Sequence, residues 1–216
     1  MSQRACFLDL GATDVGGWYI QHSIHEQWFD HAVGLLVTLA HQHGYPMDVI
    51  GWSGLHSLAE WRMIAKKYDV ICMNVRSWRY AYAKRAAEIA KSANPNVQIW
   101  VGGFHATVAR QEMETVEAFD VIISREAEGT FLELLANGGS EARFIEGSLG
   151  AYSNMDDLPY IDREVWPKAP GSAWPLESPG GWGPGPRAAT LISGRGCPFA
   201  CSFCAPAERN HFNVTR

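Results

Sequence analysis

Three cysteines lie close together near the end of the chain, at Cys197, Cys201 and Cys204, with the spacing C-x3-C-x2-C. Gly194 and Gly196 precede them and give the backbone the freedom to wrap around a bound group. Thiolates are soft ligands that bind zinc or iron–sulfur clusters. Three thiolates in one loop leave a coordination position for a ligand from elsewhere. This motif is therefore the first candidate for chemistry in the chain.

Four interpretations of the motif compete. A structural zinc site needs a fourth protein ligand, for which His211 is a candidate. A thioredoxin-like redox pair would use Cys201 and Cys204 and would leave Cys197 without a role. Three unreactive thiols would need a core to fill, which a loop rich in Gly and Pro does not provide. In an iron–sulfur cluster, which usually has four thiolates, three would leave one iron open for an exogenous ligand.

Composition excludes several classes of function. The chain has 216 residues, of which 47% are hydrophobic, and a formal net charge of −5. This length suits one large domain, or one domain with part of a second. The negative charge does not favour nucleic-acid binding, and no apolar run is long enough to span a bilayer. The first residues do not have the pattern of a signal peptide. We therefore expect a cytoplasmic protein without nucleic-acid or membrane partners.

The two remaining cysteines, Cys6 and Cys72, each lie inside an apolar run. We expect both to be buried thiols of the core. In a reducing compartment, the clustering of the other three favours metal binding or catalysis over a disulfide framework.

Strand-like and helix-like segments alternate regularly over the first part of the chain. The predicted strands are nearly continuous in apolar character and cover 5–10, 47–52, 69–75, 97–103 and 119–124. The predicted helices cover 26–44, 57–68, 79–93, 106–118 and 128–139. Five β–α units predict an α/β fold with a doubly wound, flavodoxin-like parallel sheet. In such sheets ligands bind beyond the carboxyl ends of the strands.

The chain divides into three regions. Residues 1–139 hold the β–α units. Residues 140–187 accumulate Pro and Gly, above all in 169–187, and are predicted to be a connector. Residues 188–216 begin with a short apolar strand that leads into the three-cysteine motif. We interpret this last region as the start of a second, truncated domain.

Several groups lie where the carboxyl ends of the strands are expected. Asn74 and Arg76 follow the third predicted strand, and Gly102 and Gly103 end the fourth. They could contact a ligand, or they could serve turn geometry alone. Glu128 opens the last helix, where its charge complements the helix dipole. Neither a phosphate-binding G-x-x-x-x-G-K-[ST] loop nor a G-x-G-x-x-G loop is present, so nucleotide hydrolysis and dinucleotide-dependent oxidation lose support.

The stretch C-P-F-A-C-S-F-C resembles the signature of radical SAM enzymes, which is C-x3-C-x-aromatic-C on the loop after the first strand of a partial (β/α) barrel. The resemblance implies that Cys197, Cys201 and Cys204 hold a [4Fe-4S] cluster. It also implies that the open iron binds S-adenosylmethionine and that Phe203 lies near the adenine. The cofactors then supply the radical chemistry, which the protein tunes.

The front region resembles the cobalamin-binding domain of the B12-dependent radical SAM enzymes. The supporting stretches are VQIWVGGFHATVARQE and FDVIISREAEGTFLELL. This resemblance implies that Gly102, Gly103 and His105 contact cobalamin, with Asn74 and Arg76 nearby in the carboxyl-end crevice.

The chain departs from one cobalamin motif. Domains of the methionine-synthase type carry D-x-H-x-x-G after the first strand, and the matching region here has no His at that spacing. His22, His25 and His31 follow and could form a metal site, approach the corrin or lie at the surface. The aromatic residues that could cover the corrin edge are Trp18, Tyr45 and Trp78.

The two resemblances together imply the N-terminal part of a B12-binding radical SAM methyltransferase, acting on a carbon or phosphorus centre of a small-molecule or peptide substrate. An external electron donor such as flavodoxin or ferredoxin would reduce the cluster. A non-methylating cyclase or ring-contraction enzyme of the same group is the alternative. A third possibility is a cofactor-binding module without activity of its own.

Overall fold

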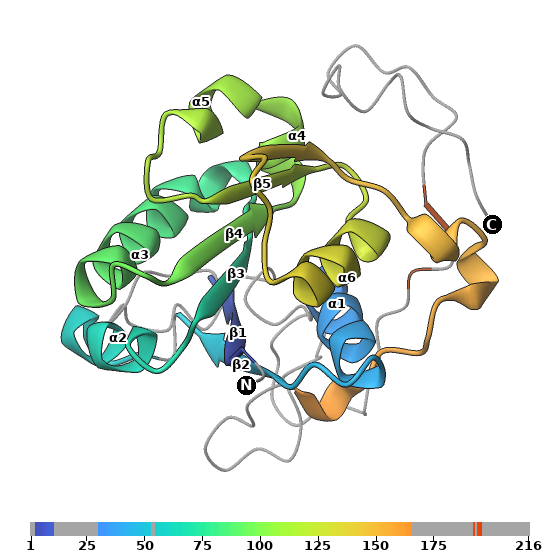
Figure 1. The fold of residues 1–216 in the computed structure, drawn as a ribbon, viewed down its shortest axis with the longest axis horizontal. Helices are drawn as coiled ribbons and strands as arrows, with labels where there is room; N and C mark the ends of the chain where they lie inside the picture. The colour runs from blue at the N-terminus through green and yellow to red at the C-terminus, as the bar shows by residue number, and fades with distance from the viewer. Residues whose placement is uncertain (1–2, 11–29, 53–54, 166–191, 193, 196–216) are drawn as a thin grey trace, which may run out of the picture.

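The computed structural model describes residues 3–10, 30–52, 55–165, 192, 194 and 195. Six parallel strands form one sheet in the order β2-β1-β3-β4-β5-β6 (Figure 1). The strands are β1 (Ala5–Asp9), β2 (Met47–Gly51), β3 (Val70–Asn74), β4 (Gln98–Gly102), β5 (Val121–Ser124) and β6 (Phe144–Glu146). The order reverses at β1, as in a flavodoxin-like sheet. The predicted α/β parallel sheet is thus confirmed, with six strands rather than five.

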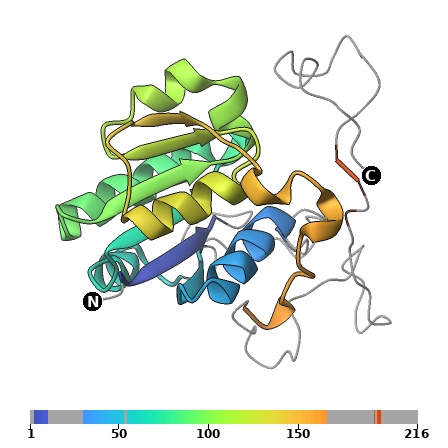
Figure 2. The same cartoon turned by 45° about the vertical axis from the view of Figure 1, so that its right-hand side comes forward.

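Helices cover both faces of the sheet (Figures 1 and 2). One face packs against α2 (Leu58–Ala65), α3 (Tyr80–Ala93), α4 (Phe104–Val108) and α5 (Arg110–Glu114). The other packs against α1 (His31–Gln42) and α6 (Glu128–Asn137). Successive strand residues alternate between the two cores, because side chains of a strand point to opposite faces. In β3, for example, Ile71 and Met73 enter the first core, whereas Val70 and Cys72 enter the second.

Local sequence signals set the ends of the longer helices. Asp30 is the N-cap of α1, and its carboxylate accepts hydrogen bonds from the Ala32 and Val33 amides. The Ser57 hydroxyl caps α2 by accepting a hydrogen bond from the backbone amide of Glu60. α6 ends at Gly138, whose φ of 73° is the left-handed conformation that favours glycine at a helix C-terminus.

The helix predicted over 106–118 is instead two short helices, α4 and α5, which meet at Ala109. Tertiary contacts hold α4 against the edge of the sheet. The His105 amide donates to the Val75 carbonyl, 2.9 Å away, and the Thr107 hydroxyl accepts from the Arg125 amide at 2.8 Å. These contacts direct α4 along the carboxyl ends of the strands, and the chain turns at Ala109 to continue as α5.

The first part of the predicted connector contributes to the folded domain. Its residues form β6, which pairs with β5, and three 3-10 helices: η2 (Gly150–Tyr152), η3 (Met155–Asp157) and η4 (Arg163–Val165). Gly150 packs on Gly129 so closely that a Cβ on Gly129 would lie 2.6 Å from the Gly150 nitrogen. The Asp162 amide donates to the Thr38 hydroxyl of α1 at 2.9 Å. This segment therefore runs past α6 and then α1 (Figure 2).

Within the described part of the chain, no helix has both the length and the apolar character that a bilayer crossing requires.

Candidate functional site

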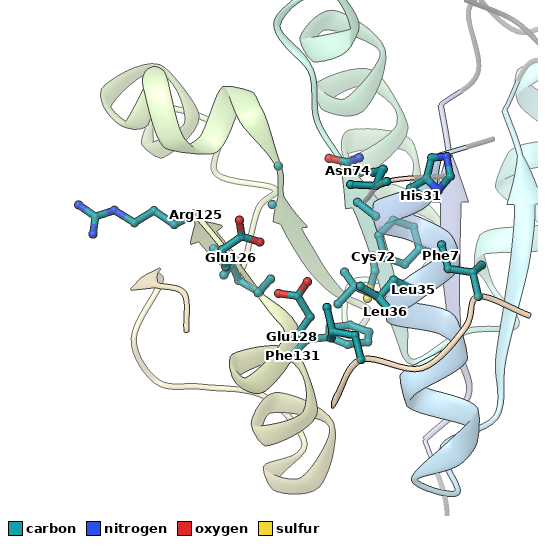
Figure 3. Close-up of a pocket in the computed structure, with 18 of the residues that line it drawn as sticks. Phe7, His31, Leu35, Leu36, Cys72, Asn74, Arg125, Glu126, Glu128 and Phe131 are labelled. Atoms are coloured by element: carbon teal, nitrogen blue, oxygen red, sulfur yellow. The ribbon is translucent and has the colours of Figure 1, made fainter. Parts of the chain in front are cut away.

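A cavity of about 550 Å³ lies between α1 and α6, over the sheet face that these two helices cover. We call it the α1–α6 cavity. It reaches the carboxyl ends of β3 and β4, and its volume is in the range of small-molecule sites. Its walls are mainly apolar and aromatic (Figure 3) and include Phe7, Leu35, Leu36, Cys72, Trp100, Ile123 and Phe131. Residues Met155 and Leu158–Ile161 of the segment after β6 close another side.

Polar groups gather at one end of the cavity, which we call its mouth. Asn74 and His31 lie on one side of it, and Glu126 of the β5–α6 loop and Glu128, the first residue of α6, lie on the other (Figure 3). The mouth therefore lies at the carboxyl edge of the sheet, where ligands of doubly wound folds bind.

Asn74 connects the end of β3 to the start of α1. Its side-chain amide donates to both carboxylate oxygens of Asp30, at 3.1 and 2.9 Å. Arg76 lies 3.9 Å from the same carboxylate. Asp30 thus caps α1 and also contacts Asn74, the last residue of β3, and Arg76, which follows that strand. Asn74 lines the α1–α6 cavity, whereas Arg76 is not among the cavity residues.

The two glycines at the end of β4 allow close approach at the mouth. Gly103 has a φ of 96°, and a Cβ there would overlap the Asn74 side chain. A Cβ on Gly102 would lie 3.3 Å from the Ile123 carbonyl oxygen. Both glycines line the cavity. Gly103 is therefore needed for backbone conformation and for the position of Asn74.

His105 is buried beside the cavity residues but is not one of them. Its Nδ1 lies 3.0 Å from the Ser77 hydroxyl oxygen, and its ring packs against that of Tyr80 with centroids 4.7 Å apart. Nε2 lies 3.1 Å from a Glu112 carboxylate oxygen, without the alignment of a hydrogen bond. These contacts connect α4 with the residues after β3.

Glu128 is the unusual group of the mouth because it is a carboxylate with only 4% of its surface exposed. Oε1 pairs with Arg195 Nη2 at 2.5 Å, while Oε2 is buried without a hydrogen-bond partner among the described residues. Arg195 also pairs with Glu126. Burial lowers the pKa of Arg195, but hydrogen bonds to the two glutamates and their charges outweigh this effect and raise it above the ordinary value. The mouth therefore offers a free acceptor atom in a water-poor position.

The chain was compared with models of known protein families. The family model of the B12 binding domain matches residues 19–135, more than half of the chain. The chain belongs to the B12-binding domain family.

Two curated proteins are similar to this B12-binding chain. An uncharacterized methyltransferase of Pyrococcus horikoshii is 27% identical over 165 residues, which is 66% of this chain and 33% of that protein. An anaerobic magnesium-protoporphyrin IX monomethyl ester cyclase of Cereibacter sphaeroides is 25% identical over 206 residues, which is 88% of this chain and 33% of that protein. The chain thus spans about a third of the length of these relatives.

The B12-binding domain brings together some of the predicted residues and not others. His31 lines the cavity with Asn74, Gly102 and Gly103. Tyr45 packs against the core beneath α1. Trp78 is half exposed, with the Arg79 guanidinium 4.0 Å above its ring. The predicted positions that lie outside the described residues are Trp18, His22, His25, Cys197, Cys201, Phe203, Cys204 and His211.

The burial predicted for Cys6 and Cys72 is confirmed, and burial raises the pKa of both thiols. Among the described residues, His, Cys, Asp and Glu form no cluster suited to a metal ion.

Sequence reasoning missed two features of the mouth. It assigned Glu128 only to the helix dipole, and it gave Arg195 no role. A carboxylate flanked by small and apolar residues, in E-A-E-G-T-F, was the available signal for burial of Glu128. For Arg195 the available signal was its place between two glycines directly before the cysteine motif.

Proposed function

We propose that this chain is the cobalamin-binding part of a radical SAM enzyme and that the α1–α6 cavity receives part of the cobalamin. The family match supports a B12-type ligand. The cavity's position, at the carboxyl edge beside the β1–β3 switch point, supports the same site.

Properties of the cavity fit this ligand. A volume of about 550 Å³ is enough for one flat heteroaromatic group and its linker, but not for a whole corrinoid. Phe7, Trp100 and Phe131 line it and provide apolar surface for such a group. The corrin ring would lie outside the cavity, along the edge formed by Asn74, Gly102 and Gly103.

The observation that carries the proposal is Glu128 Oε2 at the mouth, which is buried and has no hydrogen-bond partner among the described residues. A buried carboxylate oxygen without a donor is costly, so a ligand that brings an N–H or O–H group is favoured there. The side chains at the rim of cobalamin are amides, which are such donors. Bound cobalamin would supply a cobalt centre that carries a one-carbon group, and the protein would bind and orient it.

The enzyme class is inferred from the sequence motif and from the relatives. Cys197, Cys201 and Cys204 are proposed to hold a [4Fe-4S] cluster that binds S-adenosylmethionine, with Phe203 near the adenine and an external flavodoxin or ferredoxin as reductant. We favour methyl transfer to a small-molecule or peptide substrate. The similarity to the ring cyclase along 88% of this chain makes cyclisation the second candidate.

A titration of the anaerobically purified chain with hydroxocobalamin tests the cavity. Visible absorbance and gel filtration would report binding, and co-elution of cobalamin with wild-type protein is expected. Ala32 lines the cavity from the exposed first turn of α1. An indole in its place fills the mouth, so Ala32→Trp is expected to weaken binding by at least about tenfold, or about 1.4 kcal/mol.

The matched control is Gln42→Trp, which adds the same side chain to an exposed position at the other end of α1. It is expected to bind cobalamin as the wild type does. Equal affinity in all three proteins would show that cobalamin does not bind in the α1–α6 cavity. No binding by folded wild-type protein would contradict the proposal. Product analysis with labelled S-adenosylmethionine on the full-length enzyme separates methyl transfer from cyclisation.

A further inference from the structure

Arg195 lies near the end of the sequence and pairs with two carboxylates of the B12-binding domain. It stands two positions before Cys197 in the sequence and 69 positions after Glu126, with which its guanidinium pairs. The second nitrogen of the same guanidinium pairs with Glu128. One planar cation therefore bridges a carboxylate of the β5–α6 loop and one of the first residue of α6, an arrangement suited to arginine and not to lysine.

The Glu126 side chain is half exposed, but the pairing of Arg195 with Glu128 is not an ordinary surface salt bridge. The Arg195 side chain is 22% exposed and the Glu128 side chain 6%. Exposed pairs contribute little because water and salt screen them, whereas a carboxylate as buried as Glu128 depends on its cation. Both glutamates line the α1–α6 cavity together with Arg195 and Ile192. The residues just before the cysteine motif are thus part of the cavity wall.

The neighbouring arginine of the loop shows that this orientation is specific. Arg125 pairs with Glu146 of β6, and its side chain points away from the cavity, while Glu126 and Glu128 are the acidic groups at the mouth (Figure 3). The arginine and the two glutamates between the end of β5 and the start of α6 therefore have different partners. Arg125 holds β6, and the glutamates hold Arg195.

We propose that Arg195 is a positioning residue that, by pairing with Glu126 and Glu128, holds the start of the three-cysteine motif at the mouth of the α1–α6 cavity. Consecutive Cα atoms are about 3.8 Å apart, so the Cα of Cys197 is within about 7.6 Å of the Cα of Arg195. If the proposal holds, this clamp keeps the first cysteine close to the cavity. That the cavity holds cobalamin rests on the proposed function, but the clamp itself does not.

Hydrogen exchange of the whole chain, without any cofactor, tests the clamp. In Arg195→Gln the amides of residues 192–195 are expected to exchange at least about tenfold faster than in the wild type, because the clamp that orders them is lost. The double variant Glu126→Gln, Glu128→Gln should give the same increase. The matched control is Arg125→Gln, which removes an ion pair from the same loop and should leave exchange at 192–195 unchanged. Unchanged exchange in Arg195→Gln, or an equal increase in the control, overturns the inference.

Alkylation of Cys197 by iodoacetamide, followed by mass spectrometry, tests the positioning. Methylcobalamin in the dark is expected to slow alkylation of Cys197 at least about fivefold in the wild type but not in Arg195→Gln. Arg195→Lys should restore protection only in part, because lysine cannot bridge both carboxylates. The buried thiols of Cys6 and Cys72 serve as unreactive internal references.

The outcomes separate the two proposals. If methylcobalamin binds wild-type protein but leaves alkylation of Cys197 unchanged, the positioning role of Arg195 is wrong. If methylcobalamin does not bind at all, the proposed function fails, and hydrogen exchange alone then supports or overturns the clamp.

Discussion

Gly103 shows how one residue without a side chain shapes the mouth of the cavity. Its φ of 96° lies in the region that non-glycine residues avoid. Its missing Cβ also leaves the space that Asn74 occupies when it reaches Asp30. Backbone conformation and a polar contact across the sheet therefore depend on the same atom being absent.

Replacement of Gly103 by Ala is expected to lower the free energy of unfolding by about 2–4 kcal/mol, since a strained φ and an overlap with Asn74 add together. Urea denaturation followed by far-UV circular dichroism measures this. Gly51→Ala is the control because no atom lies within 4 Å of its Cβ position, and its φ is ordinary. Its effect should stay within about 0.5 kcal/mol. Equal stability of the two variants would contradict the role given to Gly103.

At the scale of elements, the position of α1, one wall of the cavity, depends on a single carboxylate at its N-terminus. The Asp30 carboxylate accepts hydrogen bonds from two backbone amides in the first turn of α1. It also accepts two contacts from the side-chain amide of Asn74. One carboxylate therefore starts the helix and fixes it to the carboxyl end of β3. α2 also has a side-chain cap, Ser57, but it lies on the opposite face of the sheet.

Asp30→Ala is expected to cost about 2 kcal/mol of stability, the upper range for loss of an N-cap, because Asn74 also loses its partner. It should also weaken hydroxocobalamin binding several-fold, since α1 and Asn74 are then less well fixed. Ser57→Ala removes the cap of a helix outside the cavity and should cost about 1 kcal/mol without changing cobalamin affinity. Denaturation and cobalamin titration of both variants distinguish them. Equal effects on affinity would mean that α1 does not form the site.

At the scale of the whole molecule, the two faces of the sheet have different roles. The face under α2 and α3 is a closed core that contains Trp61 and four alanines of α3. The indole N–H of Trp61 donates to the Ala86 carbonyl at 2.9 Å, which fixes α2 to α3. The other face carries the α1–α6 cavity. The layer packed around Trp61 thus supports the layer that carries the cavity.

Both layers contain a buried thiol that makes global stability depend on pH. Burial raises the pKa of Cys6, and nearby Cys72 and Asp48 add to the rise; burial also raises the pKa of Cys72. The unfolded chain loses these protons above about pH 8.5, while the folded chain keeps them. Stability is therefore full below that pH and falls as the pH rises. Between about pH 7.5 and 9.5 the two thiols should lower the free energy of unfolding by about 3 kcal/mol.

Urea unfolding across this pH range, in a phosphine reductant, measures the effect. The Cys6→Ala, Cys72→Ala double variant should show a shallower decline. Burial, the hydrogen bond to Asp48 and the nearby Cys6 also raise the pKa of Tyr68, but an unfolded tyrosine titrates at about pH 10, so its contribution below about pH 9.5 is small in both proteins. The same slope in both proteins would show that the two thiols are not the cause.

The sequence by itself determined the sheet and the family. The five apolar runs became β1 to β5, because buried parallel strands need continuous apolar character that is visible locally. The glycines after β4 and the stretch that follows β5 identified the kind of domain. The caps at Asp30 and Gly138 are likewise local, since a helix end is satisfied by neighbouring residues.

Only the tertiary structure decided the site. β6 has three residues, too few for a periodic signal, and it exists because β5 offers a free edge. The break at Ala109 follows from contacts of α4 with distant strands. Asn74 lies 44 positions from Asp30, and Arg195 lies 69 positions from Glu126. Such pairings depend on which chain segments the fold brings together, so local sequence patterns cannot predict them. The cavity between α1 and α6, and the buried carboxylate at its mouth, come from that assembly.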